Sequence, residues 1–341
     1  IMPANGMVYI PPHNCSCYPE AKLFGLWTLK ASESTLDVDA LTHATAVEKG
    51  PAYGSVAWPR LWDADDQWPM HRRDAKRSGV LPTPISAQRV AWNVEVPGRL
   101  SAPVVAGDTL LVSAVNSHRV QAFDANTGSS KWTFVAAGRI DSAPTIFGNA
   151  VLFGSADGHV YCLRADDGQL IWRFRAAPTD RRLVSFEQVE SVWPVHGSVL
   201  VLDGRVYCVA GRSNFLDGGL RWLRLNARTG EKEVEQIIDQ KNPAGEGTLQ
   251  DTLQVLQMAV GLPDILSSDD KWVYMKSQLF DREGKRYEVG PNSADFAEQA
   301  SVHHGEGVHL FAPMGFLDDT WFHRSYWVFG KSFAGGHAGY Y

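Results

Sequence analysis

Short apolar segments separated by turn residues fill the middle of this chain. Residues 102–106, 109–113, 120–123 and 131–134 each have the length of a β-strand, and Gly, Asp or Asn stands between successive segments. Strands of this length joined by such residues pair as antiparallel hairpins. The pattern therefore predicts one four-stranded antiparallel sheet.

This unit recurs at a nearly constant spacing. Trp92, Trp132 and Trp172 stand 40 residues apart, and the segment Ser101–Gly107 has a close copy 41 residues later at Ser142–Gly148. Weaker copies occupy residues 6–29, 198–230, 264–284 and 307–330. Repeats of about 40 residues with strand-like content are typical of a β-propeller. We therefore expect an all-β propeller of four-stranded antiparallel blades, with the tryptophan of each last strand wedged between neighbouring blades.

The repeats predict a single domain over residues 1–341. About six blades are visible, and seven or eight are expected in a complete ring, because a propeller has four to eight blades and an open ring would expose strand edges. The chain begins at Ile1, and we expect it to be a segment of a longer protein. Residues 31–89 are predicted to form an insertion within the first blade, whose fourth strand is expected at residues 90–92.

One repeat carries a motif that resembles a known family. It runs Ala122-x-Asp124-x-x-Thr127-Gly128-x-x-x-Trp132. The second copy keeps Gly168 and Trp172, and the third keeps Gly230 but has Val234 in place of the tryptophan. The motif resembles the tryptophan-docking repeat of quinoprotein dehydrogenases and related propellers, the PQQ-like repeat family, named after pyrroloquinoline quinone. The resemblance is good over residues 90–235.

The resemblance implies the type of blade and leaves the activity open. Some members of the family are dehydrogenases that carry pyrroloquinoline quinone (PQQ) and calcium, and others are scaffold propellers without a cofactor. The chain is also similar to large PQQ-repeat proteins of planctomycete-type bacteria, which share the patterns Trp68-Pro-x-x-Arg72-x-Asp74-x-x-Arg77-Ser-Gly79 and Cys15-x-Cys17-Tyr18.

Three blades carry an insertion at the equivalent place, between their second and third strands. The insertions occupy residues 12–21, 212–219 and 314–323. Such loops emerge on one face of a propeller, together with connections between blades such as residues 179–193. Inserts gathered on one face indicate a binding face, although they would also serve to fill a wide central channel. The residues predicted to form the face are Tyr18, Arg181, Arg182, Arg212, Asp217, Asp318, Trp321, His323 and Arg324.

The first of these loops also contains possible metal ligands. His13, Cys15 and Cys17 offer the soft donors that copper(I) or zinc prefers. A disulfide or simple thiol pair and ordinary loop residues are the alternatives. Cys162 and Cys208 lie within apolar strands and are predicted to be buried, inert thiols.

The composition of the chain argues against several classes of partner and of site. The net charge of −6 comes from 32 basic and 38 acidic residues that are interspersed, so no nucleic-acid-binding surface is indicated. The sequence has no apolar run of 18 residues, so no segment is expected to span a membrane. The sequence also lacks the adjacent Cys-Cys pair that the resemblance implies for most quinoprotein dehydrogenases, and it has no Cys-x-x-Cys-His haem motif.

These features together favour a non-catalytic binding or scaffold propeller. We expect a protein or glycan ligand on the face that bears the inserted loops, and a location in the periplasm or outside the cell. A dehydrogenase dependent on PQQ and calcium is the first alternative. A propeller that binds or cleaves polysaccharides through the aromatic and basic residues of the same face is the second.

Overall fold

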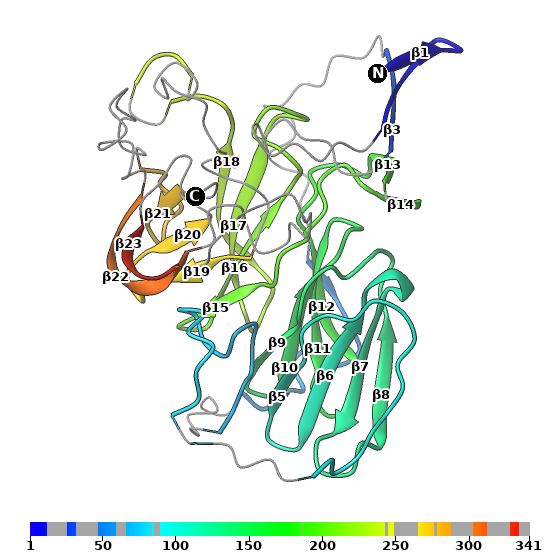
Figure 1. The fold of residues 1–341 in the computed structure, drawn as a ribbon, viewed down its shortest axis with the longest axis vertical. Helices are drawn as coiled ribbons and strands as arrows, with labels where there is room; N and C mark the ends of the chain where they lie inside the picture. The colour runs from blue at the N-terminus through cyan, green and yellow to red at the C-terminus, as the bar shows by residue number, and fades with distance from the viewer. Residues whose placement is uncertain are drawn as a thin grey trace.

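The computed structural model describes residues 1–11, 26–31, 47–58, 66–82, 84, 89–185, 187–242, 245–248, 265–275, 278–287, 303–311 and 328–333. Within these residues the chain is built from antiparallel β-sheets and the short 3-10 helix η3 (Val115–Ser117). The sheets are the blades of a β-propeller (Figure 1). The predicted fold class is therefore confirmed.

Three successive blades contain the four strands that the repeats predict. The first contains β5 (Val104–Ala106), β6 (Thr109–Ala114), β7 (Arg119–Asp124) and β8 (Ser130–Val135). The second contains β9 (Thr145–Phe147), β10 (Ala150–Gly154), β11 (His159–Arg164) and β12 (Leu170–Arg175). The third contains β15 (Leu200–Leu202), β16 (Arg205–Ala210), β17 (Leu220–Asn226) and β18 (Lys232–Ile238).

Smaller sheets flank these three blades. On one side follow β19 (Ser267–Ser268), β20 (Val273–Met275) and β21 (Gln278–Phe280), and then the pair β22 (His303–Phe311) and β23 (Val328–Phe333). A three-stranded sheet near the N-terminus contains β1 (Met2–Ala4), β2 (Met7–Ile10) and β3 (Trp27–Lys30). The hairpin of β13 (Arg182–Ser185) and β14 (Gln188–Ser191) stands between the second and third blades in the sequence.

The hydrophobic core lies between neighbouring blades. One apolar cluster joins Leu111 and Trp132 of the first blade to Phe153 of the second. Another joins Trp172 of the second blade to Leu223 of the third, and the next joins the third blade to the β19–β21 sheet. Each blade therefore buries its apolar faces against its neighbours. A single blade on its own would leave those faces in water.

Tryptophans at the 40-residue spacing connect the blades. The indole Nε1 of each donates a hydrogen bond to a backbone carbonyl of the next blade: Trp92 to Ala125 at 3.0 Å, Trp132 to Ala165 at 2.7 Å and Trp172 to Ala227 at 3.1 Å. Each ring also rests on a glycine with positive φ in that turn, where an added Cβ would lie 2.7 Å (Gly128), 2.6 Å (Gly168) or 2.6 Å (Gly230) from a ring atom. The expectation that these tryptophans wedge between blades is confirmed.

The third blade achieves the same contact in a different way. Val234 occupies the position of the missing tryptophan, and Trp222 of the neighbouring strand β17 covers the next turn instead. A Cβ on Gly284 would lie 2.7 Å from the Trp222 ring, which also stacks on Phe280 with ring centroids 5.7 Å apart. Within the described residues Nε1 of Trp222 has no hydrogen-bond partner. The packing is thus retained and the hydrogen bond is lost.

The fourth strand that the sequence predicts beside the N-terminal sheet β1–β3 is not formed. Residues 90–92 have no strand structure, and among the described residues β3 pairs with β2 alone. Trp92 is held on the turn between β7 and β8 by its ring and Nε1, whereas β3 lies beside β13 (Figure 1). A tryptophan can dock on a turn without strand pairing. The 40-residue spacing therefore predicted the contact of Trp92 correctly, whereas the strand predicted at residues 90–92 was wrong.

Parts of the predicted insertion belong to other blades. The strand β4 (Val47–Lys49) adds a fifth strand to the second blade, because it pairs with β12. Residues 68–79, which we call the inner strap, run along the innermost strands, between the first blade and the β19–β22 sheets (Figure 1). Its backbone hydrogen bonds join Trp68 to Val105 of β5 (2.8 and 2.9 Å), Pro69 to Ile146 of β9 (2.7 Å), Ala75 to Ser268 of β19 (2.8 Å) and Lys76 to Leu310 of β22 (2.8 Å).

Arg77 locks the inner strap in place. Its side chain is fully buried, with Nε donating to the carbonyl of Leu266 at 2.9 Å and Nη1 to the carbonyl of His71 at 3.0 Å. Burial, together with the nearby charges of Arg77 and Arg72, lowers the pKa of His71 to about 3. Across the strap, burial also lowers the pKa of His309 to about 4, with Asp269 opposing the shift. Both imidazoles are therefore neutral in the folded protein.

We predict that Gly168→Ala destabilises the fold more than Gly54→Ala. Both glycines have positive φ, +71° and +76°, but only a Cβ at Gly168 would meet the Trp132 ring, at 2.6 Å, since no atom lies within 4 Å of one at Gly54. We expect a loss of roughly 2–4 kcal/mol for Gly168→Ala and about 1 kcal/mol for Gly54→Ala in urea unfolding. Equal losses would show that the tryptophan contact contributes nothing.

We also predict that stability falls between pH 7 and pH 5. The unfolded chain protonates His71 and His309 near the ordinary value of 6.5, whereas their folded pKa values are about 3 and about 4. Acid therefore favours the unfolded state, by about 2 kcal/mol for each histidine at pH 5. Urea unfolding of His309→Asn at both pH values should show a pH dependence shallower by about that amount. An unchanged pH dependence would contradict the buried, neutral state of His309.

Candidate functional site

The loops between second and third strands and the connections between blades gather at one end of the sheets. We call this end the loop face. Its described parts are residues 136–144, the β13–β14 hairpin and residues 211–219. The opposite end, the turn face, carries the tight turns between first and second and between third and fourth strands. In Figure 1 the hairpin projects beyond the ends of the blades, close to β3.

A buried network of charges joins separate segments of the loop face. Glu190 of β14 is 2% exposed, and its Oε2 lies 3.1 Å from Nη2 of Arg139, while Oε1 pairs with Nη2 of Arg212. Arg139 also binds Asp141 through Nε at 2.8 Å. Asp141 in turn pairs with Nδ1 of His196 at 2.5 Å. The network therefore connects the β8–β9 connection, the hairpin and the loop after β16.

The pKa shifts show how strongly these charges depend on one another. Burial would raise the pKa of Asp141, but His196 and Arg139 outweigh it and hold that pKa well below its usual range. Burial lowers the pKa of Arg212, against the opposing effect of Glu190. Buried charges of this kind are tolerated only when they are paired. Each member thus requires its partners to remain in place.

The network fixes the β13–β14 hairpin from beneath. Leu183 and Glu190 face each other across the hairpin, and Glu190 enters the buried network. Gln188 near the tip reaches the first blade, where its Oε1 lies 2.9 Å from Nε2 of His118. The opposite side of the hairpin presents the cross-strand pair Val184 and Val189, which are 60% and 56% exposed. A well-anchored element therefore displays an apolar pair to solvent.

The structure brings several of the predicted face residues together. Arg212 lies at the centre of the network, and its guanidinium carbon is 4.9 Å from the centre of the Trp27 ring. The carbonyl of Asp217 accepts a hydrogen bond from Trp193 at 3.2 Å. Burial raises the pKa of Asp217, and Arg181 and Arg212 oppose the shift. Arg182 is separate from this group, since it is exposed and pairs with Asp180 at 2.9 Å.

The remaining predicted site residues lie outside the described residues. They are the face residues Tyr18, Asp318, Trp321, His323 and Arg324 and the metal-ligand candidates His13, Cys15 and Cys17. Over the ranges that the structure does describe, no three His, Cys, Asp or Glu side chains are arranged to hold a metal ion. Cys162 and Cys208 are buried free thiols, as predicted, and burial raises both pKa values, that of Cys208 to about 12.

Sequence reasoning missed Arg139, Asp141 and His196 as members of the site. One signal was present, because Gly138-Arg139 repeats Gly98-Arg99 at the 40-residue spacing just ahead of the repeated Ser-Ala-Pro segment. A repeated arginine between apolar strands must find a buried partner. Its partner Glu190 lies 51 residues away in a hairpin outside the repeat, so the pair itself could not be read from the periodicity.

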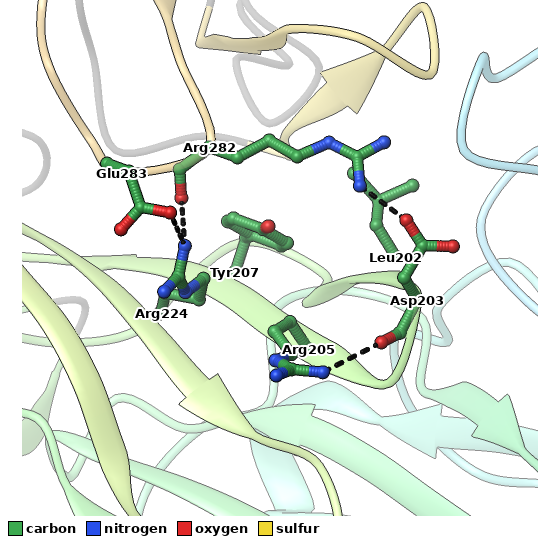
Figure 2. A pocket seen from close by; sticks show the side chains of 7 residues that line it. All are labelled: Leu202, Asp203, Arg205, Tyr207, Arg224, Arg282 and Glu283. Carbon is green, nitrogen blue, oxygen red and sulfur yellow. Dashed lines mark hydrogen bonds and ion pairs between the residues drawn. The ribbon is translucent and has the colours of Figure 1, made fainter.

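A hollow lies on the turn face (Figure 2). It has a volume of about 280 Å³ and is lined by Leu202, Asp203, Arg205, Tyr207, Arg224, Arg282 and Glu283. These residues come from the third blade and from the turn that follows β21. None of them was predicted as a site residue.

The centre of the propeller does not fit the quinone that some family members carry. The innermost strands β5, β9, β19 and β22 all bond to the inner strap, so the chain itself occupies the space in which a central planar cofactor would contact them. Among the described residues, no helix is long and apolar enough to cross a membrane.

We predict that Glu190→Gln destabilises the protein strongly. The change leaves the buried guanidinium groups of Arg139 and Arg212 without their shared carboxylate, and breaking such buried pairs costs about 3–5 kcal/mol. The control is Asp180→Asn, which removes the exposed partner of Arg182 and should cost less than about 1 kcal/mol. Urea unfolding measures both, and equal effects would show that burial of the network has no energetic importance.

The repeats match a family of known proteins. Residues 85–284 match the family described as outer membrane protein assembly factor BamB. The BamB protein of Yersinia pestis is 30% identical over 147 residues, which cover 40% of this chain and 36% of that protein. BamB of Nitrosomonas eutropha is 26% identical over 167 residues, which cover 49% of this chain and 37% of that protein. The chain thus matches little more than a third of the length of these relatives.

A solved structure supports the fold alone. The europium-containing methanol dehydrogenase is similar with a TM-score of 0.50 and 14% identity, over 74% of this chain and 53% of that one. At this identity the likeness carries no information on activity. The family match, by contrast, covers more than half of the chain. The chain therefore belongs to the PQQ-like repeat family of the outer membrane protein assembly factor BamB.

Proposed function

We propose that this chain is a non-catalytic scaffold that binds another protein through its loop face, with the β13–β14 hairpin as the main contact. The name of its family, an outer membrane protein assembly factor, supports a scaffold role. The observation that carries the proposal is the exposed pair Val184 and Val189 on a hairpin whose other side is fixed by buried charges.

The chemistry of the hairpin favours a protein partner over a glycan. Two valines side by side form an apolar contact that only another apolar surface would bury with a gain in free energy. Arg182 stands on the same side as Val184, because alternate residues of a strand share a face. Arginine is enriched at protein interfaces, and the buried centre of an interface is more apolar than the rest of the surface.

Anchoring makes the hairpin suited to tight binding. A flexible hairpin would lose conformational freedom when a partner bound it, which weakens the affinity. Here Glu190, Gln188 and Leu183 already hold the hairpin through ion pairs, a hydrogen bond and core packing. The surface is therefore largely organised before the partner arrives.

The wider setting follows from the same proposal. We propose that residues 1–341 form a single propeller domain with an insertion at 31–89, and that the protein acts in the periplasm or outside the cell. The assembly role named for the family supports the periplasm, where outer membrane proteins are handled. The loops at 12–21 and 314–323 would then enlarge the partner surface around the hairpin.

Site-specific crosslinking in the host tests the proposed face. The full-length protein would carry a photo-crosslinking amino acid at Val184, at Val189 or, as control, at Val135 on the edge strand β8, which is 59% exposed. We expect protein adducts from the two hairpin positions and none from Val135. Outer membrane protein levels should fall in cells with the double change Val184→Ser and Val189→Ser and stay unchanged with Val135→Ser. Equal adducts and equal levels for all three sites would overturn the proposal.

A further inference from the structure

The hollow on the turn face is lined mainly by charged side chains. Three guanidinium groups converge on it from three elements: Arg205 at the start of β16, Arg224 in the middle of β17 and Arg282 in the turn after β21. Figure 2 shows them around the ring of Tyr207, which lies at the base of the hollow. The hollow is on the opposite end of the blades from the hairpin, so it is independent of the proposed partner surface.

The guanidinium groups are held in position by contacts around the hollow. Glu233 receives hydrogen bonds from Nε of Arg205 at 3.0 Å and from Nε of Arg224 at 3.1 Å. Nη1 of Arg224 also donates to the carbonyl of Arg282 at 2.7 Å. Arg205 and Arg224 are therefore held side by side on one carboxylate, and like charges this close require anions nearby.

Two of the present counter-anions are weakly held. Nη1 of Arg282 pairs with Asp203, and Nη1 of Arg224 pairs with Glu283 at 2.6 Å. The side chains of Asp203 and Glu283 are 76% and 69% exposed, whereas that of Glu233 is 22% exposed. Ion pairs that are this open to water contribute little and exchange easily. Glu233 thus orients the arginines, and Asp203 and Glu283 are positioned to be replaced.

We propose that this hollow binds a phosphate-type oxyanion through Arg205, Arg224 and Arg282. Guanidinium groups bind phosphate oxygens with paired, charge-assisted hydrogen bonds. Groups arriving from three directions suit a tetrahedral anion, which has acceptor oxygens on several sides, better than a flat carboxylate. A phosphate dianion also carries more charge than Asp203 or Glu283. The volume of about 280 Å³ leaves room for the first atoms of a phosphate ester.

The buried ring of Tyr207 forms an uncharged floor of the hollow. Tyr207 is 2% exposed, and burial raises the pKa of its hydroxyl, an effect that Arg224 and Arg282 oppose. The hydroxyl therefore keeps its proton at neutral pH and adds no negative charge beneath the anion. The site would accept inorganic phosphate or a phosphate group at the end of a larger molecule such as a lipid headgroup.

Titration of the whole chain with inorganic phosphate tests the site. Calorimetry at constant ionic strength should give saturable binding to the unchanged protein and at least tenfold weaker binding to Arg282→Gln. Arg182→Gln removes a comparable exposed arginine on the loop face and should leave the binding unchanged. Asp203→Asn should tighten the binding severalfold, because it removes the competing carboxylate and leaves Arg282 in place. Asp180→Asn alters the net charge equally and should have no effect.

Two further arms identify the source of the phosphate. Glycerol phosphate reports a soluble ester, and vesicles of phosphatidylcholine with or without phosphatidic acid report a headgroup. Binding to either one with the same order among the variants supports the site. The proposal is overturned if phosphate does not bind, if Arg282→Gln binds as the unchanged protein does, or if Asp203→Asn and Asp180→Asn act alike. A circular dichroism spectrum of each variant verifies that it is folded.

Discussion

The contact of a tryptophan ring with a glycine turn of the next blade is the interaction on which this structure depends. It occurs at Trp92, Trp132 and Trp172. The indole nitrogen of each also donates a hydrogen bond to a backbone carbonyl in that turn. The contact orients each blade relative to the next and closes the apolar layer between them. Its importance is clearest in the third blade, where the hydrogen bond is absent and Trp222 of a different strand still supplies the ring.

Because the blades are oriented in this way, the loop face and the turn face differ in their connections and in their charged residues. The loop face receives the long connections, and their charges are buried together as Arg139, Asp141, Glu190 and Arg212. That network holds the β13–β14 hairpin with its valines outward. The turn face receives the short turns, and its arginines remain near the surface around the hollow beside Tyr207. The proposed protein contact and the proposed anion site therefore use different residues.

The sequence predicted the features that repeat from blade to blade. It did not predict the segments that run across several blades. The strands, their turns and the docked tryptophans follow from local spacing, so the order of residues was enough to place them. The inner strap could not be placed in this way, because Trp68 bonds to Val105 and Arg77 bonds to Leu266, far along the chain. The same reason explains why Arg212 was found within an insert while its partner Glu190 was not chosen. Trp92 shows the limit, since its ring docks as predicted without the predicted strand.

We propose that the buried charges hold the β13–β14 hairpin rigid before any partner binds. Hydrogen exchange of the full chain, followed by mass spectrometry, tests this most directly through the backbone amides of residues 182–191. We expect these amides to exchange as slowly as those of the blade strand β11, and we expect Glu190→Gln to accelerate the exchange of the hairpin amides before that of β11. Hairpin amides that exchange at the rate of an unstructured peptide in the unchanged protein would contradict the proposal.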